Sequence, residues 1–503
     1  MSRFTLLAHR YGSKGLKSSL LSSSESFYWH DYETSGANVF EDRPLQFAGV
    51  RTDKHFNVIG KPLVHYCRPS PDCLLHPAAI RVTGISPYKA LAEGTAEGAF
   101  MAQILSEFMV PETCVLGYNS IRFDDEITRF ALYRNFFPPY AREFGQNRSR
   151  WDLIDVARAM YALRPEGIVW PTREDGLPSF RLEDLTAANG IDHGNAHDAL
   201  ADVLATIDLA RLLKEKQPAL FDTLYAQRGK QAIAPLLNTV DPKPVVHVSG
   251  QFGAQRSNLA IVLPLATHPT NKNEVICADL GGESAFLDQS PEDISKLLFT
   301  PKAEFPEGMQ RPPLKTIKIN RAPVVLPTTW VSGEPAKRLG LDGERARASL
   351  AAYRGARQAD PGKFTQFIQQ IYADRNFEPR TDPDTQLYAG FLGRRDEALL
   401  ETIRQATPDS LASNTWTFED RRLPEMFFRY RARNFPETLD ADEKARWREH
   451  CQDMLADKAG PNWEDFNKQL NEERSREGLS ATQIAALDDL ERYMGELRAE
   501  LTG

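Results

Sequence analysis

A chain of 503 residues with 41% hydrophobic and 26% charged side chains is typical of a globular protein, and its length predicts about two to four domains. The formal net charge of −8 excludes a general basic coat, so any nucleic-acid site must be a local basic groove. Five scattered cysteines without a C-x-x-C pair indicate reduced thiols in a cytoplasmic protein, and no apolar run approaches the roughly 20 residues that span a bilayer.

The first 26 residues differ in composition from the rest of the chain. They are rich in serine, carry four basic residues and contain no acidic residue before Glu25. A targeting peptide is one interpretation, but the apolar stretch at residues 4–8 is too short for a secretory signal. The composition favours a disordered N-terminal extension over residues 1–26.

Residues 27–214 alternate between strand-like and helix-like patterns, which predicts an α/β domain. The predicted elements are, in chain order, strands at 27–32, 46–51 and 57–67, a helix at 99–108, a strand at 113–118, and helices at 124–135 and 198–214.

Two further regions follow. Residues 218–371 contain many β-branched residues and prolines, especially over 242–327, and predict a second domain of short strands. Residues 374–503 have helical spacing and predict a helical C-terminal domain, in which the polar tail after Asn471 indicates a solvated helix.

Two acidic residues stand two positions apart on the first predicted strand. Because side chains alternate across a strand, Asp31 and Glu33 are expected to project from the same face. Neighbouring carboxylates repel one another unless a cation neutralises them, and Mg²⁺ or Mn²⁺ is the natural oxygen-seeking partner.

Two later segments supply further candidates. Asp124 begins a predicted helix that follows a strand and a short loop, where an acid can face the first pair across the end of the sheet. His197 lies at the start of another predicted helix, and Asp202 lies more than one turn along it. Singly, Asp124 or Asp198 could cap a helix and His197 could be a surface histidine. The ordered set of three segments favours catalysis.

This set resembles that of the DEDDh exonucleases, which have a ribonuclease H-like fold. Many local segments are similar to the bacterial exonuclease I family, and the resemblance extends from about residue 27 to the C-terminus. The similar segments are residues 30–34, 80–85, 118–126, 151–155, 161–167, 176–182, 247–253 and 428–436.

The resemblance implies an α/β exonuclease domain at 27–214, an SH3-like domain at 218–371 and a helical domain at 374–503. It implies that four carboxylates hold two Mg²⁺ ions, which Mn²⁺ could replace, and that His197 is the general base. The four are Asp31, Glu33, Asp124 and Asp202. Paired metals of this kind activate water and stabilise the leaving oxygen, and a histidine accepts a proton near neutral pH.

The family's substrate is single-stranded DNA, which it degrades from the 3′ end to 5′-mononucleotides, and repair and recombination are the implied processes. The residues that match substrate-binding positions are Glu33, Arg129, Tyr140, Phe144, Arg158, Arg181, Lys230 and Asn273, with Arg181 nearest the terminal nucleotide. Arg164 matches a position that docks single-stranded DNA-binding protein. For each arginine, an ion-paired surface role is the alternative.

Several questions stay open at this point. The segment 427–435 interleaves arginines with aromatic residues, which suits either stacked bases or a helix with its aromatic residues packed inward. A related enzyme that trims RNA or proofreads a polymerase, and a catalytically silent single-strand-binding protein, are alternative functions. A monomer is expected.

Overall fold

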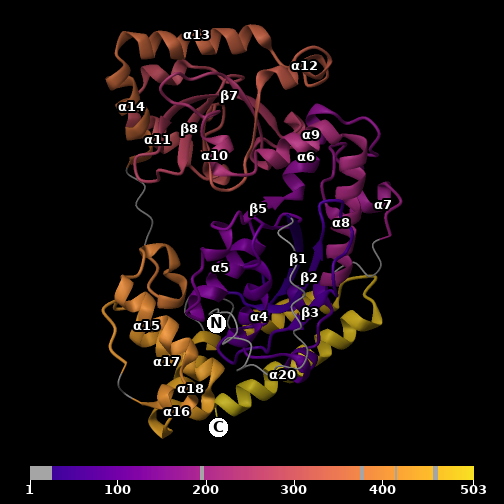
Figure 1. Cartoon of the computed structure of the whole chain (residues 1–503), viewed down its shortest axis with the longest axis vertical. Helices are drawn as coiled ribbons and strands as arrows, with labels where there is room; N and C mark the ends of the chain where they lie inside the picture. Colours follow the sequence, from indigo (N-terminus) through magenta and orange to yellow (C-terminus); the bar gives the residue numbers. More distant parts are fainter. Residues whose placement is uncertain (1–24, 193–197, 374–378, 414–415, 457–462, 503) are drawn as a thin grey trace. The chain divides into compact units, whose positions relative to one another are not determined.

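The computed structural model of the chain describes residues 25–192, 198–373, 379–413, 416–456 and 463–502 (Figure 1). Residues 1–24, most of the predicted N-terminal extension, therefore lie outside the described residues, and Ser26 already belongs to the first strand. The chain forms two compact units. The first comprises the described residues within 1–149, 194–204 and 379–503, and the second those within 150–193 and 205–378.

The first unit is built on a mixed sheet. Four of its strands lie in the order β3-β2-β1-β4, with β1 antiparallel to β2 and parallel to β4. Their bounds are β1 Ser26–Thr34, β2 Pro44–Thr52, β3 Leu63–Tyr66 and β4 Thr113–Gly117. The predicted strand at 57–67 is thus mostly wrong, because residues before Leu63 contribute only an isolated bridge between Thr52 and Val58.

Helices cover one face of this sheet (Figure 1). Tyr28, Tyr32 and Phe47 of the strands pack with apolar side chains of α4 (Glu97–Phe108) and α5 (Asp124–Arg134). Alternation along β1 therefore directs Asp31 and Glu33 away from this core. The other helices of the unit are α2 Pro77–Thr83, α3 Pro87–Glu93, α15 Arg394–Gln405, α16 Pro408–Ala412, α17 Leu423–Asn434, α18 Ala441–Ala456, α19 Trp463–Arg474 and α20 Ala481–Thr502.

The prediction of a solvated helix after Asn471 is wrong. Helix α20 buries Leu487, Leu490 and Met494 in a cluster that also contains Ile80 of α2 and Phe466 of α19. In the sequence of α20, charged residues alternate with the apolar ones. The apolar residues nevertheless recur on one side of the helix and form a packing face.

The second unit contains an antiparallel five-stranded sheet in the order β10-β6-β7-β8-β9. One face packs on α11, α13 and α14 around Ile276, Ile368 and Ile371, and the other packs on α10 around Val262 and Ile233. The strands are β6 Val245–Val248, β7 Leu259–Thr267, β8 Glu274–Asp279, β9 Leu314–Lys318 and β10 Val324–Pro327. The helices just named are α10 Lys230–Ile233, α11 Pro291–Phe299, α13 Gly343–Ala359 and α14 Pro361–Ala373.

The remaining strand and helices come from the predicted exonuclease region, from the start of the predicted SH3-like region and from the link to α13. They are β5 Ser149–Asp152, α6 Leu153–Leu163, α7 Leu182–Ala188, α8 Ala199–Lys216, α9 Pro218–Ala226 and α12 Glu334–Arg338. Helix α6 contacts β6 and β10, so part of the exonuclease region and the antiparallel sheet form one compact body.

Candidate active site

Three carboxylates meet at the end of β1. Oxygen atoms of Asp31, Glu33 and Asp202 all lie within 4.8 Å of one another. Asp31 and Glu33 come from the same face of the strand, as their spacing predicts, and Asp202 comes from the first turn of α8. The fold thereby brings together residues from β1 and α8 that are far apart in the sequence.

Asp124 reaches β1 by a different route. Strand β4 pairs with β1 only as far as Leu116, and the bare Gly117 then passes so close to His30 that a Cβ atom would lie 2.5 Å from the His30 carbonyl oxygen. Beyond this point, none of the strands that the structure describes pairs with β1 on that side. The Tyr32 amide instead donates a hydrogen bond of 3.2 Å to the Asp124 carboxylate at the start of α5.

Two aspartates near the start of α8, Asp198 and Asp202, have different roles. The Asp198 carboxylate accepts hydrogen bonds of 3.1 Å from the amides of Leu200 and Ala201, which is the geometry of an N-cap. Asp202, one turn later, joins the carboxylate group instead. His197, the predicted general base, lies outside the described residues.

The carboxylates strongly influence one another. Burial, and then the charges of Asp124, Glu33 and Asp202, raises the pKa of Asp31 well above its ordinary value. Burial, and then Asp202 and Asp124, raises the pKa of Glu33 in the same way. Ionised carboxylates this close repel one another, and a divalent cation with oxygen ligands would remove that repulsion. The donor set therefore fits the predicted Mg²⁺ or Mn²⁺.

Arg129, a predicted substrate-binding residue, is buried and fully engaged with protein groups. Its guanidinium donates hydrogen bonds of 2.7 and 2.9 Å to Glu143, 2.8 Å to Glu126 and 3.2 Å to the Tyr388 hydroxyl. The ring of Tyr140 lies over this guanidinium, with 5.5 Å between the Arg129 Cζ atom and the ring centroid. Arg129 thus supports Tyr140 and ties α5 to the C-terminal region.

An aromatic surface extends from Tyr140. The ring of Phe391 is 88% exposed and meets Tyr140 edge-on, with 6.1 Å between the ring centroids. Tyr388 is half exposed, and the predicted substrate residue Phe144 is 64% exposed. Sequence reasoning missed Tyr388 and Phe391, because residues 387–391 carry no motif and only the fold brings them beside Tyr140.

The other predicted substrate residues lie in the second unit. Arg158 on α6 donates a 2.7 Å hydrogen bond to Asp155, and Arg181, at the N-cap of α7, has a largely exposed side chain paired with Glu183. The structure brings Lys230 and Asn273 together, since the Lys230 ammonium donates a 2.6 Å hydrogen bond to the Asn273 side chain.

Arg164, the predicted partner-binding residue, packs against Trp330. Its guanidinium donates to the backbone carbonyls of Leu163 and Trp330 at 2.6 and 3.3 Å, and its Cζ atom lies 5.2 Å from the centroid of the Trp330 ring. Both residues belong to the second unit.

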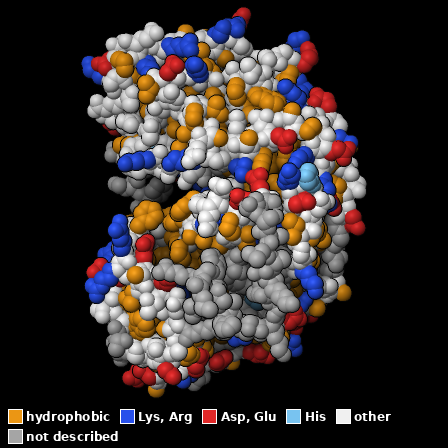
Figure 2. All heavy atoms as spheres, in the orientation of Figure 1, with side chains coloured by type: hydrophobic (Ala, Val, Ile, Leu, Met, Phe, Trp, Pro, Cys, Tyr) orange, Lys and Arg blue, Asp and Glu red, His pale blue; other side chains and the backbone are white. Residues whose placement is uncertain are grey.

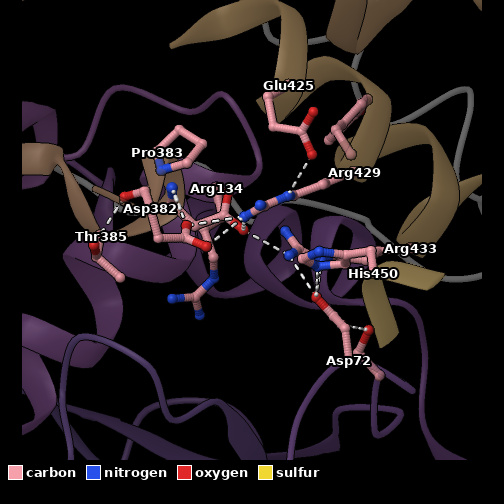
Figure 3. A network of polar contacts seen from close by, with 12 residues as sticks. Asp72, Arg134, Asp382, Pro383, Thr385, Glu425, Arg429, Arg433 and His450 are labelled. Carbon is pink, nitrogen blue, oxygen red and sulfur yellow. Dashed lines mark hydrogen bonds and ion pairs between the residues drawn. The ribbon is translucent and has the colours of Figure 1, made fainter. Parts of the chain in front are cut away.

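The arginine and aromatic residues at 427–435 form a packed helix. In α17, Phe427, Phe428 and Tyr430 are buried, which favours the packing alternative over base stacking. Arg429 and Arg431 are buried as well, and the Arg433 side chain is only 4% exposed. Figure 3 shows Arg429 and Arg433 reaching acidic groups, and Arg433 joins Asp72 to Asp384 with distances of 2.6 Å to each carboxylate.

The surface charge agrees with the acidic composition. On the face drawn in Figure 2, Lys and Arg side chains are interspersed with acidic and hydrophobic ones, and acidic side chains gather over the C-terminal helices. No continuous basic coat covers the described residues visible there. Among the described helices, none has the length and apolar character needed to cross a membrane.

Comparison with known proteins identifies the family of the chain. Family models for "Exonuclease", "Exonuclease I SH3-like domain" and "Exonuclease I C-terminal domain" match residues 28–210, 228–374 and 381–497. Exodeoxyribonuclease I of Escherichia coli (strain K12) is 47% identical over 427 residues, which cover 84% of this chain and 89% of that protein. The chain belongs to the exonuclease I family.

Solved structures of this family agree with the assignment. Escherichia coli exonuclease I in complex with a dA16 oligonucleotide superposes with a TM-score of 0.88 at 43% identity, over 94% of this chain and 100% of that one. The zinc-bound form of the Escherichia coli exonuclease I–single-stranded DNA complex gives a TM-score of 0.87, also at 43% identity, over 94% of this chain and 99% of that one. The predicted fold, an exonuclease domain with an SH3-like and a C-terminal domain, is confirmed.

Proposed function

We propose that this exonuclease I family member hydrolyses single-stranded DNA in the 3′→5′ direction and releases 5′-mononucleotides. The observation that carries the proposal is the meeting of Asp31, Glu33 and Asp202 within 4.8 Å. Asp124 is held against the same strand by the Tyr32 amide. Family relatives crystallised with single-stranded oligonucleotides support DNA as the substrate.

Asp31, Glu33, Asp124 and Asp202 would hold two divalent ions, which we propose to be Mg²⁺. When bound, such ions polarise the phosphate and lower the pKa of water. The protein contributes rigid ligands: β1 fixes Asp31 and Glu33 by its pairing with β2, and the N-capped start of α8 fixes Asp202. Glu33 would also contact the substrate, and His197 would accept the proton of the attacking water.

The DNA strand would be held by separate charge and stacking contacts. Tyr140, whose ring meets the exposed ring of Phe391, and the exposed Phe144 are proposed to contact bases. Contacts with the DNA backbone are proposed for Arg158, Arg181, Lys230 and Asn273. Arg129 is paired with Glu143, so it would act on the DNA through the ring of Tyr140; a direct contact would require it to release Glu143.

Further parts of the proposal concern cellular context and domain limits. We propose a monomer that acts in DNA repair and recombination, with domains at 27–214, 218–371 and 374–503. Arg164 beside Trp330 is proposed to dock single-stranded DNA-binding protein. No disulfide joins the five cysteines, all of which are buried, and this supports a reducing compartment such as the cytoplasm.

The test is a nuclease assay on labelled single-stranded DNA, duplex DNA and RNA of one sequence, each with and without Mg²⁺. Single-stranded DNA should be degraded with Mg²⁺, duplex DNA and RNA much more slowly, and no substrate without a divalent ion. Preferred degradation of RNA would indicate an RNA-trimming enzyme. Binding without cleavage under every condition would indicate a silent single-strand-binding protein, and either result would contradict the proposal.

A further inference from the structure

Arg158 is held by three different groups of the second unit. Its Nη1 atom donates a 2.7 Å hydrogen bond to Asp155, one turn earlier on α6. Its Cζ atom lies 6.0 Å from the centroid of the Phe180 ring. The third contact comes from the antiparallel sheet, where Gly250 lies directly against the guanidinium.

The backbone around Gly250 is fixed by the turn that follows β6. The Ser249 amide donates a 2.7 Å hydrogen bond to the Asn258 carbonyl, and the Asn258 amide donates one of 2.9 Å to the Gly253 carbonyl. Ser249 and Asn258 are both buried. Since α6 also contacts β6, this turn and the helix that carries Arg158 belong to one compact body.

A side chain at Gly250 would crowd the Arg158 guanidinium. A Cβ atom there would lie 3.0 Å from the Arg158 Cζ atom, and 3.1 and 3.2 Å from Nη2 and Nη1. These distances are shorter than ordinary van der Waals contacts, so the guanidinium would have to move. The backbone of Gly250 is not left-handed, so alanine is allowed there on backbone grounds.

In this position the Arg158 guanidinium can still donate a hydrogen bond to a ligand. Nη1 is bonded to Asp155, and Nε is buried. Nη2 donates no hydrogen bond to any residue that the structure describes, so it is the donor left for a ligand. A phosphate oxygen is the natural acceptor for this fixed donor, because the guanidinium is always charged and forms charge-assisted hydrogen bonds with phosphate.

We propose that Gly250 is a positioning residue for Arg158. Because Gly250 has no side chain, the Arg158 guanidinium can pack against the backbone of the SH3-like domain, and this contact orients it toward a phosphate of single-stranded DNA. This inference rests on the proposed function, because it requires Arg158 to contact the substrate. It assigns the SH3-like domain a role in substrate binding through a residue that touches no substrate itself.

The test compares Gly250→Ala and Gly250→Val with Arg158→Ala, using the full chain. Arg158→Ala should weaken binding of a single-stranded oligonucleotide by about 10- to 100-fold, the range of a charge-assisted hydrogen bond. It should also make the log–log salt slope shallower by about 0.7. Gly250→Ala should weaken binding by about 2- to 5-fold, and Gly250→Val by about 10-fold with the same loss of slope.

Two further readouts separate positioning from a general structural defect. In the Arg158→Ala background, Gly250→Val should weaken binding by less than about 2-fold, because the two changes act through one contact. With DNA in cleavage assays, Gly250→Val should raise KM and leave kcat unchanged. Gly355→Ala and Gly355→Val on α13 are the matched controls, and both should bind as wild type. Apart from its chain neighbours and the backbone of its own helix, no described residue has an atom within 4 Å of a Cβ at Gly355.

Three results would overturn the inference. Wild-type affinity of both Gly250 variants, with Arg158→Ala weakened, would show that Gly250 does not position Arg158. An equal loss from Gly250→Val with and without Arg158 would assign the effect to another contact. If Arg158→Ala itself bound as wild type, the phosphate contact and the inference would both fail, while Mg²⁺-dependent cleavage would still report on the proposed function. Should Gly250→Val fail to fold, Gly250→Ala gives the same comparison.

Discussion

The half-buried Asp31 carboxylate lies beside three others, and the repulsion among these charges destabilises the folded protein. Asp31→Asn or Asp202→Asn should therefore reduce Mg²⁺-dependent cleavage by at least about 100-fold, since each removes a metal ligand. Without metal, Asp31→Asn should unfold at the same or a higher temperature than wild type, because a repulsive charge is gone. Cleavage rates and thermal melts in a chelator measure both effects.

Asp175→Asn is the control for these variants. Asp175 is an exposed acid paired with Arg173, and its replacement should leave cleavage unchanged. Near-normal Mg²⁺-dependent cleavage by Asp31→Asn or Asp202→Asn would remove that residue from the ligand set.

Charge and stacking contacts should differ in their dependence on salt. Tyr140→Ala should weaken binding by about 1–3 kcal/mol with an unchanged salt slope, because stacking neutralises no phosphate. Arg129→Gln should also leave the slope unchanged, since Glu126 and Glu143 already pair with Arg129. Fluorescence anisotropy over a salt series measures both. A shallower slope for Arg129→Gln, by about 0.7, would instead make Arg129 a phosphate contact.

His30 is a buried histidine among aromatic rings, stacked on Phe47 with 5.9 Å between the ring centroids. Burial, and then Arg142, lowers the pKa of His30 from 6.5 to about 3, against a small opposing effect of Asp125. The unfolded chain therefore binds a proton below about pH 6.5 that the folded protein excludes down to about pH 3. His30 should thus lower the free energy of unfolding as pH falls, by up to about 1.4 kcal/mol per pH unit.

His30→Phe should remove this part of the pH dependence. Urea unfolding of the wild type and the variant at about pH 7 and about pH 5 measures the difference, with His55→Phe at an exposed site as the control. An identical pH dependence in wild type and His30→Phe would show that His30 is protonated in the folded protein.

At the scale of elements, local sequence patterns predicted the strand and the two helices that hold the carboxylates. The D-x-E spacing placed Asp31 and Glu33 on one face of β1, and the helices starting near Asp124 and Asp198 were predicted within one or two residues. The pattern could not show that β4 stops pairing at Leu116 and leaves the Tyr32 amide to Asp124, because that depends on register between strands. The aromatic surface around Phe391 likewise depends on long-range packing.

Helix α20 provides the clearest test of such packing. Leu487 is fully buried against α2 and α19, so Leu487→Ala should lower the free energy of unfolding by about 2–5 kcal/mol. Ile484→Ala, on the same helix at a site 47% exposed, should change it by less than about 0.5 kcal/mol. If both variants changed the free energy of unfolding by the same small amount in denaturant melts, α20 would be a solvated helix, as its polar sequence predicts.

At the scale of the whole molecule, the predicted exonuclease and C-terminal regions share a buried ion network within the first unit (Figure 3). Burial alone would raise the pKa of Asp72, but Arg43 and Arg433 outweigh it and hold the pKa well below its ordinary value. Removing one partner of such a network leaves a buried charge uncompensated. The C-terminal region is therefore part of the folded body that carries the carboxylates, and its aromatic residues are built into the same unit.

The central claim is that these carboxylates support metal-dependent removal of nucleotides from the 3′ end of single-stranded DNA. The most direct measurement follows one oligonucleotide labelled at its 3′-terminal nucleotide and, separately, at its 5′ end. With Mg²⁺, the 3′ label should appear at once as a mononucleotide while the 5′ label remains on shortening strands, and Asp202→Asn or a chelator should abolish both changes. Early release of the 5′ label, or cleavage that persists in Asp202→Asn or without a divalent ion, would contradict the account.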